Sequence, residues 1–153
     1  MAYFLEKNDK PLSFEPPARG FTYRDYEKWD DDIRLELIDG AVYLMSSPTE
    51  WHRWVCGELF WQLKSHFRGK ACNVYSELDV RPFYQEGDSD QTVVRPNIIV
   101  VCDEGKVFGK KNCEGAPDFI IEVLSEGTAG RDLADKKTQK KSLPAKARRI
   151  CVP

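Results

Sequence analysis

The sequence predicts an α/β fold, and three observations support that prediction. Short runs rich in β-branched residues, at positions 93–94, 98–102 and 119–124, are typical of strands buried on both faces of a sheet. Apolar residues recur at helical spacing between residues 49 and 67, which predicts one long amphipathic helix. Asp39 and Gly40 separate two alternating runs and predict a hairpin, because both residues tolerate a positive φ.

The first half of the chain supplies the expected helices. Residues 1–20 are polar and contain three prolines, so we expect an extended N-terminal arm. Thr22 can cap a short helix from residue 23 to about 29. The long helix should start after Ser47 or Thr49 as its cap and end near residue 67, before Arg68 and Gly69.

The remaining segments predict strands, turns and a basic end. We expect strands at 34–38, 41–45, 73–76 and 78–81, and a solvated acidic turn at 85–91. A charged linker with room for a helical turn covers 103–117, and another helix should begin at 131–137. Residues 139–153 are basic and show no amphipathic period.

Length and charge restrict the possible classes of protein. The 153 residues suffice for one domain with a core, and the net charge of −2 provides no overall basic field for nucleic acid. No segment has the pattern of a signal peptide or of a membrane helix, so we expect a cytoplasmic protein. The five cysteines show no C-x-x-C spacing, which favours reduced thiols over a zinc site or a disulfide framework.

Two polar residues interrupt the buried runs. Asn97 follows Pro96 at the start of one run, and Glu122 lies inside the other. A buried carboxylate destabilises the fold unless a proton, a cation or a metal ion compensates it. Glu122 therefore predicts either a structural ion pair or a functional site.

Several short motifs together carry a resemblance to a known family. They are FTYRDY (21–26), ELIDG (36–40), ELDVR (77–81), VRPNI (94–98), CD (102–103), GAPD (115–118), IEVLS (121–125) and RDL (131–133). In order and spacing, over roughly residues 21–137, they resemble the Uma2 family of restriction endonucleases, which is similar in fold to the PD-(D/E)XK nucleases. The resemblance implies a central mixed sheet flanked by helices, with a metal site at one end of the sheet.

The resemblance also implies a set of site residues. Carried over position by position, the site would use Glu36, Asn97, Glu122 and Lys136, with the first three as metal ligands. The implied cofactor is Mg²⁺, with Mn²⁺ as an alternative, and hard oxygen ligands suit both ions. The implied substrate is DNA, and a homodimer is an assembly that such a nuclease can form.

The chain departs from the family pattern in two places. The family has Asp where this chain has Asn97, which removes one negative charge and predicts weaker metal binding and a lower rate. After residue 139 the further family elements are not recognisable, so we expect a truncated domain at 21–138 and an aberrant basic tail at 139–153. Loss of a strand there would expose a sheet edge.

Each site residue also has a structural alternative. Glu36 could be a solvated hairpin residue, Asn97 a relic of a metal ligand, and Lys136 part of a solvated helix face. His52 could be a packed histidine or a residue of the active cleft. For the whole chain, the alternatives to a weakened endonuclease are an inactive DNA-binding module of the same fold and a protein-interaction domain that uses an exposed sheet edge.

Overall fold

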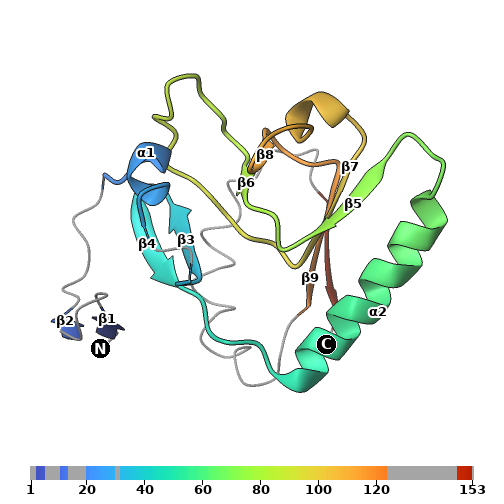
Figure 1. Cartoon of the computed structure of the whole chain (residues 1–153), viewed down its shortest axis with the longest axis horizontal. Coiled ribbons are helices and arrows are strands. Elements are labelled where there is room, and N and C mark those ends of the chain that lie inside the picture. The colour runs from blue at the N-terminus through green and yellow to red at the C-terminus, as the bar shows by residue number, and fades with distance from the viewer. Residues whose placement is uncertain (1–2, 6–10, 14–19, 30–31, 124–147, 153) are drawn as a thin grey trace.

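The computed structural model of the chain describes residues 3–5, 11–13, 20–29, 32–123 and 148–152 (Figure 1). Its elements, in chain order, are β1 (Tyr3–Leu5), β2 (Pro11–Ser13), α1 (Tyr23–Tyr26), β3 (Leu35–Ile38), β4 (Ala41–Leu44), α2 (Glu50–Phe67), β5 (Asn73–Ser76), β6 (Val80–Arg81), β7 (Ile98–Val101), the 3₁₀ turn η1 (Glu104–Lys106), β8 (Cys113–Glu114), β9 (Phe119–Val123) and β10 (Arg148–Val152). Within these residues, no helix combines the length and apolar character that crossing a bilayer requires.

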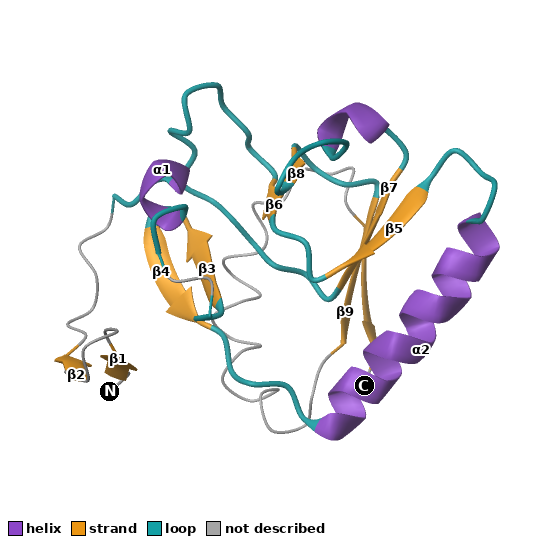
Figure 2. Cartoon of the chain, in the orientation of Figure 1, coloured by secondary structure: helices purple, strands orange, loops and turns teal. Residues whose placement is uncertain are grey.

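Among the described residues, the central sheet has four strands in the order β10-β9-β7-β5 (Figure 2). β7 pairs antiparallel with both β5 and β9, whereas β10 runs parallel to β9. The sheet is therefore mixed, as predicted. The two apolar runs that the sequence placed in the core are neighbours at its centre.

Alternate residues of the central strands enter two different apolar clusters. Ile98, Val100 and Ile121 pack under the inward side of α2, together with Leu59 and other residues of that helix. Ile99, Val101 and Ile120 face the opposite cluster, which includes residues of β3, β6 and β8. Hence α2 covers one face of the sheet, and the described residues on the other face are short strands and loops.

The N-terminus of α2 is fixed by a cap that the sequence predicted. Thr49 has an extended backbone, and its side chain accepts a hydrogen bond from the backbone N–H of His52 at 3.2 Å. The helix ends at Phe67, and Gly69 follows with a φ of 74°. The first turn of α2 therefore has a defined position, next to the C-terminal end of β9.

The Asp39-Gly40 hairpin forms as predicted and carries α1. Asp39 and Gly40 both have positive φ, at 49° and 75°. The aromatic helix α1 packs on the hairpin through a cluster that includes Tyr23 and Leu37. Tyr26 donates a hydrogen bond to the backbone carbonyl of Leu35 at 3.1 Å, so α1 and β3 form one unit.

The acidic turn at 85–91 is not fully solvated, contrary to the prediction. Asp90 is buried and accepts two hydrogen bonds from the guanidinium of Arg81, which is itself 2% exposed. The guanidinium also lies 3.6 Å from the ring centroid of Tyr23. Burial opposes the charge of Arg81, but hydrogen bonds and charges from Asp90 and Asp88 outweigh it and raise the pKa of the arginine.

Both ends of the chain differ from the sequence-based expectation. The N-terminal arm includes an antiparallel pair, β1 with β2. In the basic tail, residues Arg148–Val152 form β10 and pair with β9 from Phe119 to Val123. β10 therefore covers β9 and is itself the edge of the sheet. A hydrophobic period is not needed for a strand whose backbone supplies the pairing.

The expectation of reduced thiols was wrong for one pair. Cys72 and Cys102 form a disulfide. They directly precede β5 and directly follow β7, and Asn73 pairs with Val101 in that ladder. The strand register therefore places the two cysteines opposite each other, a proximity that their 30-residue separation in the sequence does not reveal.

Candidate active site

Asn97 lies at the end of the central sheet, where it connects two neighbouring strands. Its side-chain Oδ1 accepts a hydrogen bond from the backbone N–H of Val123 at 2.8 Å. Its backbone carbonyl accepts a second one from the N–H of Glu77 at 3.1 Å. Asn97 is only 7% exposed, so both hydrogen bonds are sheltered from water. It thereby holds the end of β9 and the residue after β5 in register with β7.

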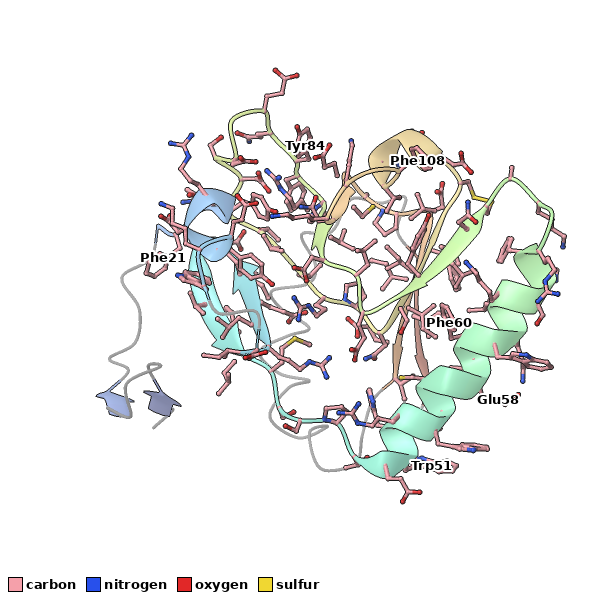
Figure 3. All side chains as sticks on the ribbon, viewed as in Figure 1. Phe21, Trp51, Glu58, Phe60, Tyr84 and Phe108 are labelled. Atoms are coloured by element: carbon pink, nitrogen blue, oxygen red, sulfur yellow. A yellow bond between two sulfur atoms is a disulfide. The ribbon has the colours of Figure 1, made fainter. Side chains whose placement is uncertain are left out.

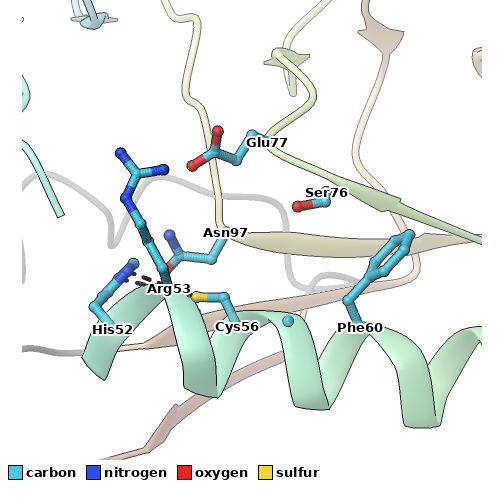
Figure 4. A pocket seen from close by; sticks show the side chains of 8 residues that line it. His52, Arg53, Cys56, Phe60, Ser76, Glu77 and Asn97 are labelled. Atoms are coloured by element: carbon cyan, nitrogen blue, oxygen red, sulfur yellow. Dashed lines mark hydrogen bonds between the residues drawn. The ribbon is translucent and has the colours of Figure 1, made fainter. Parts of the chain in front are cut away.

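A pocket of about 240 Å³ opens beside Asn97, between the sheet and the first turns of α2 (Figure 4). It is lined by two groups of residues. The helix contributes His52, Arg53, Cys56, Gly57 and Phe60, and the strand ends contribute Ser76, Glu77 and Asn97. The pocket thus combines basic, acidic and amide groups against one apolar wall.

His52 connects α2 to the end of β9. Its Nε2 lies 3.0 Å from the backbone carbonyl oxygen of Val123. Because a carbonyl can only accept, Nε2 carries the proton and donates. In the neutral ring Nδ1 is then an acceptor, and the Sγ of Cys56 lies 3.7 Å from it. His52 thus packs against β9 and also lines the pocket, which fits both interpretations from the sequence.

Cys56 is not suited to act as a nucleophile. Burial, followed by the negative charges of Glu77 and Glu122, raises the pKa of its thiol to about 11. The thiol is therefore protonated at neutral pH, whereas nucleophilic catalysis needs the thiolate. Because the charges of Glu77 and Glu122 both act on this thiol, both carboxylates contribute to the electrostatic environment of the pocket.

Glu77 places its carboxylate at the pocket from an unusual backbone conformation. Its φ is 51°, in the left-handed region that few residues other than glycine adopt. Arg34 forms an ion pair with its Oε1 at 2.9 Å. Arg53, one turn into α2, is exposed and lines the same pocket. The pocket therefore has an acidic group held from the strand side and a basic group on the helix side.

Two of the four predicted site residues are brought side by side. Ile98 pairs with Ile121 in the β7–β9 ladder, so the next position along each strand places Asn97 opposite Glu122. By the alternation along β9, Glu122 shares the sheet face of Ile120, the face toward β3. Glu122 is half-buried there. Asn97 precedes β7, and its Oδ1 turns instead to the backbone N–H of Val123.

The third predicted residue, Glu36, approaches the same end of the sheet from the hairpin. It is 1% exposed, and its Oε1 accepts a hydrogen bond from the backbone N–H of Arg95 at 3.1 Å, two residues before Asn97. Glu36 is not among the residues that line the pocket. It is therefore not solvated, contrary to the alternative interpretation. Lys136 lies outside the described residues.

The donor atoms around Asn97 fit Mg²⁺ in chemical type. Glu36, Glu122 and Asn97 present hard oxygen atoms, and Mg²⁺ is ordinarily held by one or two carboxylates together with waters. Over the described stretches, no group of three His, Cys, Asp or Glu side chains is arranged to hold a metal ion. Asn97 would be a neutral ligand, and its Oδ1 already accepts a hydrogen bond from Val123, so the site would hold little negative charge for a cation.

Sequence reasoning missed Arg53, Cys56 and Glu77 as residues of the pocket. Glu77 opens one of the motifs that carry the family resemblance and follows a predicted strand, a position from which a site residue could have been inferred. Cys56 follows His52 by four residues and so shares its side of the helix, and Arg53 lies three residues before Cys56. Without the order of the strands, however, nothing indicated that this end of α2 meets Asn97.

Comparisons with known proteins agree with the fold and with the motifs. The Uma2 family, described as "Putative restriction endonuclease", matches residues 23–139. The chain is also similar to a crystal structure of a "putative nuclease belonging to DUF820" from Anabaena variabilis ATCC 29413, with a TM-score of 0.61 and 18% identity, over 86% of this chain and 74% of that one. No curated protein matches the chain.

Proposed function

We propose that the chain, which belongs to the Uma2 family of putative restriction endonucleases, hydrolyses phosphodiester bonds in DNA with a divalent metal ion. Its membership of the family confirms the resemblance in its motifs and supports a nuclease function. One observation carries the proposal further than family membership: Asn97 and Glu122 lie opposite each other at the end of the two central strands, beside a pocket. The metal proposed is Mg²⁺, with Mn²⁺ as an alternative.

Each residue at this end of the sheet has a role in the proposal. Glu122 and Glu36 are the carboxylates that would hold the ion, and Asn97 offers a neutral oxygen. When bound, Mg²⁺ would polarise the phosphate and would lower the pKa of a water molecule that it holds. Lys136, carried over from the family pattern, would stabilise negative charge on the phosphate.

The pocket itself supplies positioning groups. Arg53 presents a guanidinium, whose fork of donors matches the oxygens of a phosphate. His52 fixes the backbone of Val123 directly after Glu122, which keeps that strand end in place. Phe60 forms an apolar wall that can exclude water from one side of a bound nucleotide.

We further propose that this chain is a weakened enzyme. The amide of Asn97 has no charge, and its Oδ1 already accepts the N–H of Val123 at 2.8 Å. Both features reduce what this position can contribute to a cation. Metal affinity and rate should therefore be lower than in a chain with Asp at position 97.

Nicking of supercoiled plasmid by the purified full chain, with Mg²⁺ or Mn²⁺, tests the proposal. We expect slow nicking, faster nicking by Asn97→Asp, and loss of nicking by Glu122→Gln in both backgrounds. Phe108→Ser is a matched control, because Phe108 is exposed and does not line the pocket. If neither the natural chain nor Asn97→Asp nicks DNA with either ion, the proposal is wrong.

A DNA-binding module without catalysis is the second candidate, and one observation favours it. The hydrogen bond from Val123 gives Asn97 a structural role that needs no metal. In that case the chain should slow the migration of plasmid in a gel without cutting it, and Glu122→Gln should bind DNA as the natural chain does. Metal-dependent cleavage that Glu122→Gln abolishes would eliminate this candidate.

A further inference from the structure

The amide of Asn97 presents a hydrogen-bond donor to the pocket. Its Oδ1 accepts the backbone N–H of Val123, and because an N–H can only donate, the other arm of the amide must be Nδ2. Within the part of the chain that the structure describes, Nδ2 makes no hydrogen bond. Asn97 is nevertheless more than nine-tenths buried and lines the pocket. A sheltered donor without a protein partner indicates that a ligand accepts from it.

Glu77 places acceptors next to this donor. Its backbone N–H donates to the carbonyl of Asn97 at 3.1 Å, so the two residues are held side by side. Figure 4 shows the amide nitrogen of Asn97 turned toward the carboxylate of Glu77. Oε1 of Glu77 also accepts from Arg34, but each carboxylate oxygen can accept two hydrogen bonds. The pair therefore offers a ligand one donor and, beside it, two acceptors.

The charges around the pocket balance, which favours an uncharged ligand at its inner end. Arg34 forms an ion pair with Glu77 at 2.9 Å. Arg53 is exposed at the mouth, and the negative charge of Glu122 acts on the Cys56 thiol inside. Two arginines thus stand against two glutamates. A phosphate at the inner end would meet no net positive field, whereas Arg53 can still contact one at the mouth.

The size and the apolar wall of the pocket suit a single flat ring system. Its volume of about 240 Å³ is below the roughly 300–1,000 Å³ of sites for drug-sized ligands. Phe60 lines it and also packs against the core cluster under α2, so the position of its ring is fixed. Aromatic side chains of this kind stack on nucleic-acid bases.

Gly57 leaves the pocket open on the side of the helix. It lines the pocket, and a Cβ atom added there would have no neighbouring atom within 4 Å. A larger side chain at this position would therefore extend into open space instead of clashing with the protein. This gives a way to fill the pocket without disturbing the core.

We propose that the pocket binds one unpaired guanine base of a DNA strand, an inference that rests on the proposed function only in taking DNA as the source of the base. The pairing edge of guanine presents the acceptor O6 and, beside it, two donors, N1–H and the N2 amino group. That order is complementary to Nδ2 of Asn97 and the carboxylate of Glu77. No other DNA base presents two donors on this edge. In a duplex the edge is occupied, so the base must be single-stranded or flipped out.

Fluorescence anisotropy with labelled single strands tests the proposal, using the full chain in EDTA. One strand carries a single guanine among thymines, and the comparison strand contains thymine alone. Both have the same number of phosphates, so a difference in affinity reports on the base. We expect the guanine strand to bind at least about tenfold more tightly. Strands with a central adenine or cytosine should bind more weakly than the guanine strand, and free 2′-deoxyguanosine should compete if the base alone suffices.

Three variants test the residues that the proposal uses. Glu77→Gln exchanges one acceptor for a donor, and Asn97→Asp exchanges the donor for an acceptor while it still accepts from Val123. Each should reduce the preference for guanine at least about fivefold. Gly57→Leu should abolish it by filling the pocket. Ser65→Leu is the matched control, because Ser65 is exposed on the same helix and does not line the pocket. Thermal melting by circular dichroism checks that each variant is folded.

Three outcomes would overturn the proposal. One is equal affinity of the natural chain for the guanine and thymine strands, and another is tighter binding of adenine or cytosine. The third is a preference for guanine that folded Glu77→Gln and Gly57→Leu retain. Because binding is measured in EDTA, the result is independent of cleavage. A guanine preference without any nicking would count against the proposed function alone, and nicking without that preference would overturn this inference alone.

Discussion

Replacement of Asn97 separates its structural contribution from its proposed contribution to metal binding. In Asn97→Ala the buried N–H of Val123 loses its acceptor, which lies 2.8 Å away in the natural chain. A buried donor left without a partner costs about 1–3 kcal/mol of folding free energy. For a chain of this size, about 2 kcal/mol lowers the melting temperature by about 6 °C, measured by circular dichroism.

Asn97→Asp should behave differently, because it retains the acceptor but adds a negative charge near Glu77 and Glu122. Repulsion should lower its melting temperature in EDTA, and Mg²⁺ should restore it, since a ligand that binds only the folded state stabilises that state. The natural chain should respond less to Mg²⁺. If Asn97→Ala has the same melting temperature as the natural chain, Asn97 does not hold the end of β9. If Mg²⁺ leaves Asn97→Asp unchanged, the position is not beside a metal site.

Three further predictions concern groups in and around the core. At pH 8 the Cys56 thiol, whose pKa is raised to about 11, should react with iodoacetamide at least about tenfold more slowly than a free cysteine, as measured by peptide mass spectrometry. Glu77→Gln removes a charge that raises this pKa and should therefore speed the reaction. An unchanged rate would show that Glu77 does not act on the thiol. Reducing the Cys72–Cys102 disulfide, which closes a loop over a sequence separation of 30, should lower the free energy of unfolding in urea by about 3–4 kcal/mol; Cys72→Ser should match the reduced chain and be insensitive to reductant. Arg81→Met leaves a buried carboxylate without its cation and should cost about 3–5 kcal/mol in the same assay; a loss below about 1 kcal/mol would mean that the carboxylate is solvated or protonated.

Local patterns were enough to predict the elements that form the frame of the molecule. Thr49, Asp39 and Gly40 act through residues within four positions of themselves, so the cap of α2 and the hairpin could be read from the sequence. The strands at 98–101 and 119–123 were equally clear, because burial on both faces leaves a continuous apolar run.

Features that depend on which strands are neighbours could not be read in this way. The opposition of Asn97 and Glu122 was implied only by the family resemblance, and it follows physically from the β7–β9 register. The disulfide and the pairing of β10 with β9 likewise depend on register. Asp90 seemed solvated because its sequence neighbours are polar, whereas the loop that carries it folds back onto Arg81 at the end of β6.

The left-handed backbone of Glu77 has a consequence for how this protein changes over evolutionary time. An L-residue in that conformation is disfavoured by about 1 kcal/mol, and glycine or asparagine would relieve the strain. Random substitution alone would therefore tend to remove the glutamate and leave a more stable chain with a less acidic pocket. Glutamate at position 77 therefore keeps an acidic group at the pocket at a cost in stability.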